Sequence, residues 1–333
     1  MEYYGTLGPS CQDSKLLSAL FREGMTGVRL NLSHMGLEGC AEWLEHLRRA
    51  ARETIIQPQL LIDLQGPELR IGALDMPVML QEGESLLLGE GGVPVPELLS
   101  HALIPGSELL LDDGIIRLRT VCCTGNTITC TVLRGGVLRS RKSIAVPGMQ
   151  LHPPTLTSSD YQNLKLAKQC GVTGVMLPFV RGPEDLRTLR QALRAVGAPE
   201  IQVFAKLENR AGLARLSELL PYADQIVIAR GDLGNDMPLW ELPAAQKDAA
   251  VVCRKENKSF MVVTQLLHSM HHAAVPTRAE VLDIFNAVLD GASSLMLTGE
   301  TAVGQYPVEA MRYLVQTAEQ ALVYLEREKG EKA

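Results

Sequence analysis

The chain has 333 residues, of which 46% are hydrophobic and 21% are charged, and its formal net charge is −6. This composition is typical of a globular protein, and the mild acidity excludes a basic face for binding nucleic acid. Aromatic residues make up only 4% of the chain, which also excludes stacking platforms for single-stranded nucleic acid.

Short apolar runs alternate with longer amphipathic stretches, a pattern that is typical of βαβ units and a parallel sheet. In the first part of the chain we expect strands at 3–7, 28–32 and 59–63, and helices at 15–23 and 39–52. From about residue 72 to 142 the segments become short and rich in Val, Thr and Gly, with strands expected at 108–112 and 126–132. This change predicts a small all-β domain inserted after the third strand.

The alternation resumes after Pro147-Gly148. We expect strands at 174–179, 202–207, 225–229, 259–264 and 294–297, and helices at 157–167, 183–196, 211–220, 239–255, 277–290 and 307–327. Eight strand–helix steps close a parallel barrel. The predicted fold is an α/β (β/α)8 TIM barrel of residues 1–72 and 143–333, with a small β-barrel-like lid domain at 73–142. A doubly wound open sheet is the alternative, although no Rossmann glycine fingerprint opens the first βα turn.

The cysteines and the start of the chain indicate a cellular compartment. The seven cysteines form no CxxC pair, which favours reduced thiols. No apolar run approaches the ~20 residues that span a bilayer, and the first residues lack the basic and apolar regions of a signal peptide. We therefore expect a soluble, cytoplasmic protein without a membrane partner.

Polar residues at strand ends are the candidates for chemistry, because barrel enzymes work at the carboxyl ends of their strands. Lys206 and Glu208 lie two residues apart at the end of the fifth strand and so face the same way. Asp232 is expected at the end of the neighbouring sixth strand. Two such carboxylates are typical of a Mg²⁺ site. A lysine beside that ion requires an anion between them, so we expect a phosphate, carboxylate or enolate substrate. A structural ion-pair network is the alternative.

Strands two and three add a second group. Alternation places Arg29, Asn31 and Ser33 on one side of strand two, and Asp63 ends strand three beside them. An arginine near several oxygens suits a phosphate beside a cation. An internally bonded polar layer is the alternative. Thr264, at the end of strand seven, carries a hydroxyl that could bind a substrate carboxylate, relay a proton, or cap the next helix.

A set of motifs runs in order along nearly the whole chain: Thr6-Leu7-Gly8-Pro9-Ser10, Arg29-Leu30-Asn31-Leu32-Ser33-His34, Gly66-Pro67-Glu68-Leu69-Arg70, Leu111-Asp112-Asp113-Gly114, Lys206-Leu207-Glu208-Asn209, Ala229-Arg230-Gly231-Asp232-Leu233-Gly234, Pro276-Thr277-Arg278-Ala279-Glu280 and Thr298-Gly299-Glu300-Thr301. Each motif is weak alone, but the ordered set resembles the pyruvate kinase family. The resemblance implies the glycolytic transfer of a phosphoryl group between phosphoenolpyruvate and ADP, giving pyruvate and ATP.

The same resemblance implies roles for individual residues. Lys206 would stabilise the transferring phosphoryl group and the enolate, and Arg29 would contact phosphate. Gly231, Asp232 and Thr264 would bind the substrate, with Thr264 on the side where the enolate is protonated. The expected ligands of Mg²⁺ (or Mn²⁺) are Glu208 and Asp232, those of K⁺ are Asn31, Ser33, Asp63 and the carbonyl of Leu64, and the expected nucleotide contacts are His34, Arg70 and Lys142.

The sequence departs from the family pattern at several points. Gln65 stands where the family usually has a lysine, and Pro178 stands where it often has a serine. The insert is short, and the resemblance implies a truncated member without the family's C-terminal regulatory domain, in which a homodimer through the barrel is expected. Two other functions stay open. One is a non-catalytic paralogue that binds phosphoenolpyruvate or a nucleotide, and the other is a Mg²⁺-dependent oxo-acid decarboxylase or aldolase on the same barrel.

Overall fold

The computed structural model describes residues 1–33, 35–112, 114–147, 149 and 153–330. Contacts divide the chain into two compact units. The barrel unit comprises Met1–Gly66 and Thr155–Ala333, and the inserted unit comprises Pro67–Pro154. The predicted nucleotide contact His34 lies outside the described residues.

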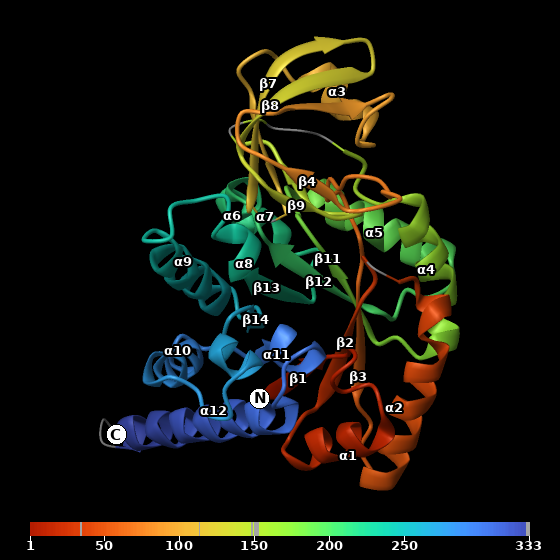
Figure 1. The fold of residues 1–333 in the computed structure, drawn as a ribbon. Helices are drawn as coiled ribbons and strands as arrows, with labels where there is room; N and C mark the ends of the chain where they lie inside the picture. The colour runs from red at the N-terminus through yellow and green to blue at the C-terminus, as the bar shows by residue number, and fades with distance from the viewer. Residues whose placement is uncertain (34, 113, 148, 150–152, 331–333) are drawn as a thin grey trace. The chain divides into compact units, whose positions relative to one another are not determined.

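A closed barrel of parallel strands forms the centre of the barrel unit (Figure 1). Around the barrel the strands run β1–β2–β3–β11–β12–β13–β14–β15, and β15 returns to β1 with Ser294 paired to Glu2. The prediction of a (β/α)8 TIM barrel is confirmed. The strand bounds are β1 Glu2–Thr6, β2 Gly27–Asn31, β3 Gln59–Asp63, β11 Gly174–Leu177, β12 Gln202–Leu207, β13 Gln225–Ala229, β14 Phe260–Val263 and β15 Ser294–Leu297.

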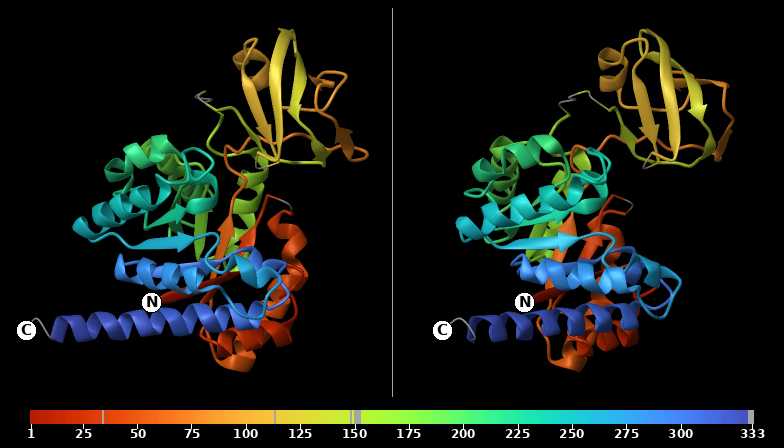
Figure 2. Two further views of the ribbon diagram at one scale, coloured as in Figure 1. Left: turned by 60° about the vertical axis from the view of Figure 1, so that its left-hand side comes forward. Right: turned by 90° about the vertical axis from the view of Figure 1, so that its left-hand side faces the viewer.

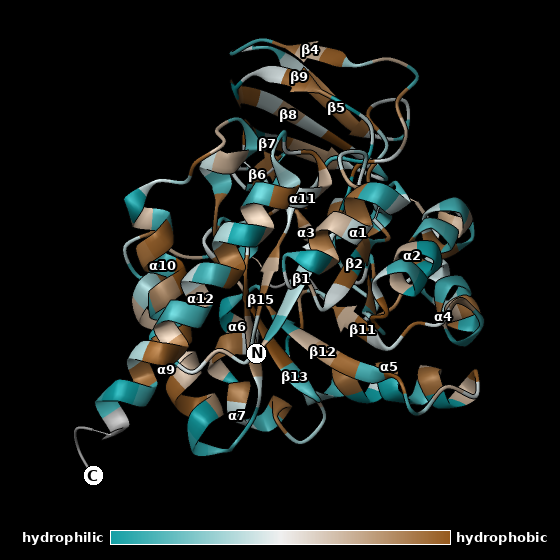
Figure 3. Cartoon of the chain, turned by 90° about the horizontal axis from the view of Figure 1, so that it is seen from below, coloured by the Kyte–Doolittle hydropathy of each residue, from teal (hydrophilic) through white to brown (hydrophobic). Residues whose placement is uncertain are grey.

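Helices surround these strands, as Figures 1 and 2 show. Several of them carry both apolar and polar turns in Figure 3, as amphipathic helices packed on a barrel do. No helix among the described residues is both long and apolar enough to cross a bilayer. The bounds are α1 Ser14–Arg22, η1 Leu37–Cys40, α2 Ala41–Thr54, α4 Ser158–Cys170, α5 Pro183–Ala195, α6 Arg210–Ala214, α7 Leu216–Leu219, α8 Arg230–Leu233, α9 Leu242–Lys255, η2 His268–His271, α10 Arg278–Leu289, α11 Gly299–Ala302 and α12 Pro307–Gly330.

Two local expectations were wrong. The strand β13 ends at Ala229 as predicted, but Asp232 does not lie at the strand end, because Arg230–Leu233 forms the short helix α8 directly after it. Gly231 and Asp232 therefore lie on a helix. The helix expected at 211–220 is divided at Arg215 into α6 and α7.

The barrel interior is filled with side chains. One face of each strand points inward and the other packs against the helices, following the two-residue period of a strand. The inner cluster consists of Tyr4, Leu61, Met176, Phe204, Val227, Ala229, Met261, Val263 and Met296. Polar residues that follow these positions near the strand ends are thus held on a packed, apolar layer.

The inserted unit has antiparallel sheets and its own apolar core. One sheet has the order β10–β6–β7–β8–β5, and β4 pairs with β9. The strands predicted at 108–112 and 126–132 correspond to β6 and β8, whereas the other strands of this unit were not predicted individually, and the short helix α3 departs from the expected all-β insert. The bounds are β4 Val78–Leu80, β5 Ser85–Gly89, α3 Glu97–Ala102, β6 Glu108–Leu111, β7 Ile116–Thr124, β8 Thr127–Arg134, β9 Gly136–Leu138 and β10 Ile144–Ala145.

Candidate active site

Lys206 lies between two buried carboxylates near the end of β12. Its Nζ is 2.8 Å from Oε1 of Glu208 and 3.1 Å from Oδ2 of Asp63. Phe204, two residues earlier on the same face of the strand, belongs to the barrel interior. The two-residue period of β12 therefore directs Lys206 and Glu208 inward above this apolar layer.

Asp63 is the shared acceptor of two cations. Its Oδ2 accepts hydrogen bonds from Nε and Nη2 of Arg29 at 2.9 and 2.6 Å, besides the contact with Lys206. Nη1 of Arg29 donates to Oγ1 of Thr6 at 3.3 Å. The structure thus brings together one connected network of four side chains: Arg29, Asp63, Lys206 and Glu208. Their internal salt bridges resemble the structural ion-pair network that the sequence left open as an alternative.

The surroundings shift the pKa of each group in this network. Burial acts to raise the pKa of Asp63, but the adjacent Lys206 and Arg29 outweigh it and hold the pKa below its usual value. Burial acts to lower the pKa of Lys206, but Asp63 and Glu208 outweigh it and raise the pKa above its usual value, so the ammonium stays charged. Burial raises the pKa of Glu208 to about 7, since Lys206 opposes this rise only in part and Asp232 and Asp63 add to it.

The donor set at Glu208 and Asp232 fits a divalent cation. Arg29 and Lys206 bring two positive charges to the cluster, whereas Asp63, Glu208 and Asp232 bring three negative charges. The pKa of Glu208 is raised because its carboxylate is buried and lies near the other two carboxylates. A bound cation would offset the excess of negative charge in the cluster and would lower the pKa of Glu208.

Glu208 and Asp232 would offer two carboxylates to a divalent cation. Among the described residues, no group of three or more His, Cys, Asp or Glu side chains converges on a metal position. Mg²⁺ is commonly held by one or two carboxylates, with waters and substrate phosphates completing its octahedron. The backbone N–H of Phe179 donates to Oε2 of Glu208 at 2.8 Å, which fixes the orientation of that carboxylate.

The substrate-binding candidates Gly231 and Thr264 are in close contact. A Cβ placed on Gly231 would lie 2.9 Å from Cγ2 of Thr264. Thr264 directly follows β14 and has a φ of +80°, a conformation that is rare for a β-branched residue. Glycine at 231 is therefore required by the close approach of the Thr264 side chain.

The residues predicted to hold K⁺ lie at the ends of β2 and β3. Oδ1 of Asn31 accepts the backbone N–H of Ser33 at 3.1 Å. Asn31 pairs with Asp63 in the strand register, and Leu64 follows Asp63 with its N–H bonded to the carbonyl of Met176 at 3.1 Å. These groups supply hydroxyl, amide, carboxylate and carbonyl oxygens from one region, a donor set suited to a hard monovalent cation.

The described nucleotide-binding candidates are neighbours within the inserted unit. Ile71, next to Arg70, donates its N–H to the carbonyl of Lys142 at 2.9 Å. Arg70 forms a salt bridge with Glu68 at 2.7 Å, and Lys142 forms one with Asp112 at 2.7 Å. Both cations are thus fixed by acidic partners.

Both departures from the family pattern lie in one small region of the barrel unit. Gly66 has a φ of +58°, and a Cβ there would lie 2.6 Å from Cγ of Pro178. The buried carboxylate of Asp160 accepts the backbone N–H groups of Gln65 and Gly66 at 2.9 and 3.1 Å. The sequence predicts only a helix that begins at Thr157. Thr157 and Asp160 form a capping box at its start, and the binding of residues 65 and 66 is a second role of Asp160 that the sequence does not show.

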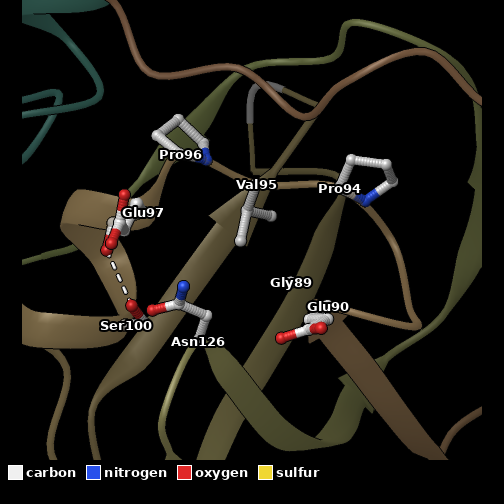
Figure 4. Close-up of a pocket in the computed structure, with 8 residues that line it drawn as sticks. All are labelled: Gly89, Glu90, Pro94, Val95, Pro96, Glu97, Ser100 and Asn126. Carbon is white, nitrogen blue, oxygen red and sulfur yellow. Dashed lines mark hydrogen bonds between the residues drawn. The ribbon is translucent and has the colours of Figure 1, made fainter.

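A hollow of about 430 Å³ lies in the inserted unit (Figure 4). It contains none of the predicted site residues. Its lining includes Glu90, Glu97 and Asn126 beside three apolar residues, Pro94, Val95 and Pro96. Among the drawn side chains, Ser100 donates to the carbonyl oxygen of Glu97 at 2.7 Å.

A TIM barrel with cations and carboxylates gathered near its strand ends has the features of an enzyme for small anionic substrates. The family model described as "Pyruvate kinase, barrel domain" matches residues 2–311. The chain therefore belongs to the pyruvate kinase family, whose members are transferases.

Curated pyruvate kinases give the same result. The protein from Aeropyrum pernix is 37% identical over 319 residues, which cover 95% of this chain and 69% of that protein. The one from Geobacillus stearothermophilus is 37% identical over 332 residues, with 95% of this chain and 56% of that protein covered. The one from Mycobacterium intracellulare is 38% identical over 317 residues, with 92% and 67% covered. The chain thus spans between 56% and 69% of the length of these relatives.

Proposed function

We propose that this chain transfers the phosphoryl group of phosphoenolpyruvate to ADP, with Mg²⁺ and K⁺, giving pyruvate and ATP. The observation that carries the proposal is the ammonium of Lys206, held 2.8 Å from Glu208 and 3.1 Å from Asp63. Arg29 lies on the same Asp63 carboxylate at 2.6 Å. Two fixed cations beside a carboxylate pair suit a substrate with several negative charges, and membership of the pyruvate kinase family supports this choice.

Lys206 and Arg29 act by positioning and by neutralising charge. In the reaction the bond between the enol oxygen and phosphorus breaks, and the phosphoryl group forms a new bond to a β-phosphate oxygen of ADP. Lys206 stabilises the charge that develops on the enol oxygen and on the transferring group, while Arg29 binds phosphate oxygens. Such electrostatic stabilisation by groups fixed in advance provides most of the catalysis of phosphoryl transfer.

Glu208 and Asp232 hold the divalent cation in this proposal. Bound there, Mg²⁺ (or Mn²⁺) would neutralise phosphate and enolate oxygens. Asn31, Ser33, Asp63 and the carbonyl of Leu64 hold K⁺. Gly231 and Thr264 bind the substrate carboxylate, and the Thr264 hydroxyl lies on the side from which the enolate carbon receives its proton. Arg70 and Lys142 bind the nucleotide, and the same role is proposed for His34. A cytoplasmic location and a homodimer through the barrel complete the proposal.

A coupled assay of ATP formation from phosphoenolpyruvate and ADP, with Mg²⁺ and K⁺, tests this function. The wild type should turn over and Lys206→Met should not. Lys168→Met is the matched control, because Lys168 is an exposed lysine that also pairs with a carboxylate, that of Glu200 at 3.1 Å. Absence of turnover above the Lys206→Met background would reject the proposal.

If no ATP is formed, two further measurements decide between the alternative functions. Decarboxylation of oxaloacetate by the same preparation would indicate the related enolate chemistry instead. Tight binding of phosphoenolpyruvate without turnover, measured by calorimetry, would indicate a binding protein.

A further inference from the structure

Arg230 is the first residue of α8 and directly precedes Gly231 and Asp232. Its side chain reaches across to the loop that follows β14. There Nε and Nη2 donate to the carbonyl oxygen of Thr264 at 3.2 and 2.7 Å. The residue next to two candidate site residues thus holds the main chain of a third.

Thr264 needs such support because its backbone conformation is unfavourable. Its φ is +80°, and Gln265 follows with a φ of +56°. Non-glycine residues in the left-handed region are strained and persist only when their surroundings fix them. Two hydrogen bonds to the carbonyl of the strained residue itself are a direct means of fixing it.

Arg230 is in turn fixed by an acidic partner on another element. Its Nη1 lies 2.8 Å from Oδ1 and 2.6 Å from Oδ2 of Asp283, on α10. The Arg230 side chain is only 12% exposed, whereas that of Asp283 is 35% exposed, so this charge-assisted contact is shielded from water on the arginine side. The planar guanidinium serves the carboxylate and the carbonyl at the same time, which a lysine with a single nitrogen would do less well.

Gly231 completes the arrangement from the same helix. Its Cα approaches Thr264 so closely that a Cβ would lie 2.9 Å from the Thr264 methyl group. Two consecutive residues of α8 therefore act on Thr264. Arg230 binds its carbonyl oxygen, and Gly231 leaves the space that its side chain occupies.

We propose that Arg230, held by Asp283, is a positioning residue that sets the direction of the Thr264 hydroxyl in the reaction. The inference rests on the proposed function, in which Thr264 binds the substrate carboxylate and faces the enolate. The Arg230 guanidinium binds the Thr264 carbonyl and the Asp283 carboxylate. It acts on the step in which Thr264 takes part, by keeping that residue in its strained conformation.

The kinetic test compares Arg230→Gln, Arg230→Lys and Asp283→Asn with a matched control. Arg210→Gln is that control, because Nε of Arg210 donates to the carbonyl of Asp236 at 3.0 Å and Nη2 pairs with Glu241 at 2.8 Å. We expect kcat to fall on the order of 100-fold in Arg230→Gln, the scale of a misplaced catalytic group. Arg230→Lys and Asp283→Asn should lose less, and Arg210→Gln should match the wild type.

A double-mutant cycle separates positioning from a general structural effect. If Arg230 acts through the Thr264 hydroxyl, Arg230→Gln should lower kcat little further once Thr264→Ala has removed that hydroxyl. Equal losses from Arg230→Gln in both backgrounds would overturn the inference.

A crystal structure of the Arg230→Gln variant tests the same point without activity. Thr264 should leave its positive φ, and a φ that stays near +80° would also overturn the inference. If the wild type fails to form ATP, the proposed function fails, whereas this structure still decides whether Arg230 holds Thr264. If Arg230→Gln does not fold, the structure of Asp283→Asn decides, since Arg230 should then release the Thr264 carbonyl.

Discussion

The ammonium nitrogen of Lys206 lies 2.8 Å from Oε1 of Glu208, the residue two positions further along the chain. Both side chains are largely buried, with 12% and 1% exposed. The pair places a cation directly beside a carboxylate that we propose as a metal ligand. A metal held by Glu208 would therefore lie close to the Lys206 ammonium, and the repulsion between the two cations would favour an anionic substrate shared by both.

Glu208→Gln should weaken the proposed metal site while leaving the fold intact. The amide oxygen of glutamine still accepts the N–H of Phe179, but the negative charge is lost. We expect the Mg²⁺ concentration for half-maximal activity to rise at least about tenfold, by comparison with losses on changing metal-supporting residues. Binding of Mn²⁺, followed by electron paramagnetic resonance, should weaken in parallel. Glu200→Gln, in an exposed lysine pair, is the control. An unchanged metal requirement in Glu208→Gln would count against Glu208 as a ligand.

Gly231→Ala should impair the site through Thr264. The added methyl would lie 2.9 Å from Cγ2 of Thr264, and a β-branched residue cannot swing that atom away without changing rotamer. Alanine favours helices, so α8 should persist, and we expect kcat/KM to fall on the order of 100-fold. Thr264→Ser removes the clashing methyl group but keeps the hydroxyl. The double variant should therefore recover part of the activity, and a double variant no better than Gly231→Ala would contradict the clash.

Much of the barrel could be predicted from the sequence because strands in its wall are short apolar runs between clear turn signals. The bounds of β3, β12, β13 and β15 agree with the predicted ranges. The short helices α8 and α11 were missed, since four residues give no helical periodicity. Of these two helices, α8 carries the candidate site residues Gly231 and Asp232, so the local pattern is least informative at a segment where chemistry is expected.

The candidate site was predictable only in part for a related reason. Spacing along β12 indicated that Lys206 and Glu208 face the same way, and their contact at 2.8 Å agrees with that reading. The strand ends placed Asp63 beside Arg29, but spacing could not show that the same carboxylate also binds Lys206, which lies 143 residues further along the chain. The hydrogen bond from Arg230 to the Thr264 carbonyl could not be predicted for the same reason. Such contacts depend on the closure of the barrel.

Asp185 should make folding stability depend on pH in the acid range. Its buried carboxylate accepts the backbone N–H of Arg181 at 2.9 Å, pairs with the Arg181 guanidinium at 2.7 Å, and accepts the hydroxyl of Thr155. Burial acts to raise the pKa of Asp185, but these partners outweigh it and lower the pKa below its usual value. The stabilisation is thus fully present above the unfolded-state pKa of about 3.9 and is lost as the pH falls through the lower folded-state value.

Asp185→Asn measures this contribution. We expect the variant to lose about 1–3 kcal/mol of unfolding free energy at neutral pH, the scale of a disrupted buried hydrogen-bond network. The difference from the wild type should shrink in urea titrations below about pH 4. The exposed Asp248 provides the control Asp248→Asn, which should change little at either pH. A difference independent of pH would show that ionisation of Asp185 is not its cause.

Asp63→Asn should destabilise the barrel more than any of these changes. Asp63 is buried and serves both Arg29 and Lys206, so the variant leaves two largely buried cations with Glu208 as the nearest carboxylate contact of Lys206. Removing one partner of a buried ion pair typically destabilises by about 3–5 kcal/mol, because the remaining charge is uncompensated.

The charge argument can be separated from lost packing. Adding Arg29→Met to Asp63→Asn removes the guanidinium that has lost its carboxylate partner, while keeping an apolar side chain of similar reach. If charge imbalance is the cause, the double variant should be more stable in urea than Asp63→Asn alone, although it should stay inactive. Glu241→Gln, which breaks the exposed pair with Arg210, should change the unfolding free energy by less than about 1 kcal/mol. A double variant less stable than Asp63→Asn would mean that Arg29 stabilises the barrel through contacts other than Asp63, with its 3.3 Å hydrogen bond to Thr6 as the first to examine.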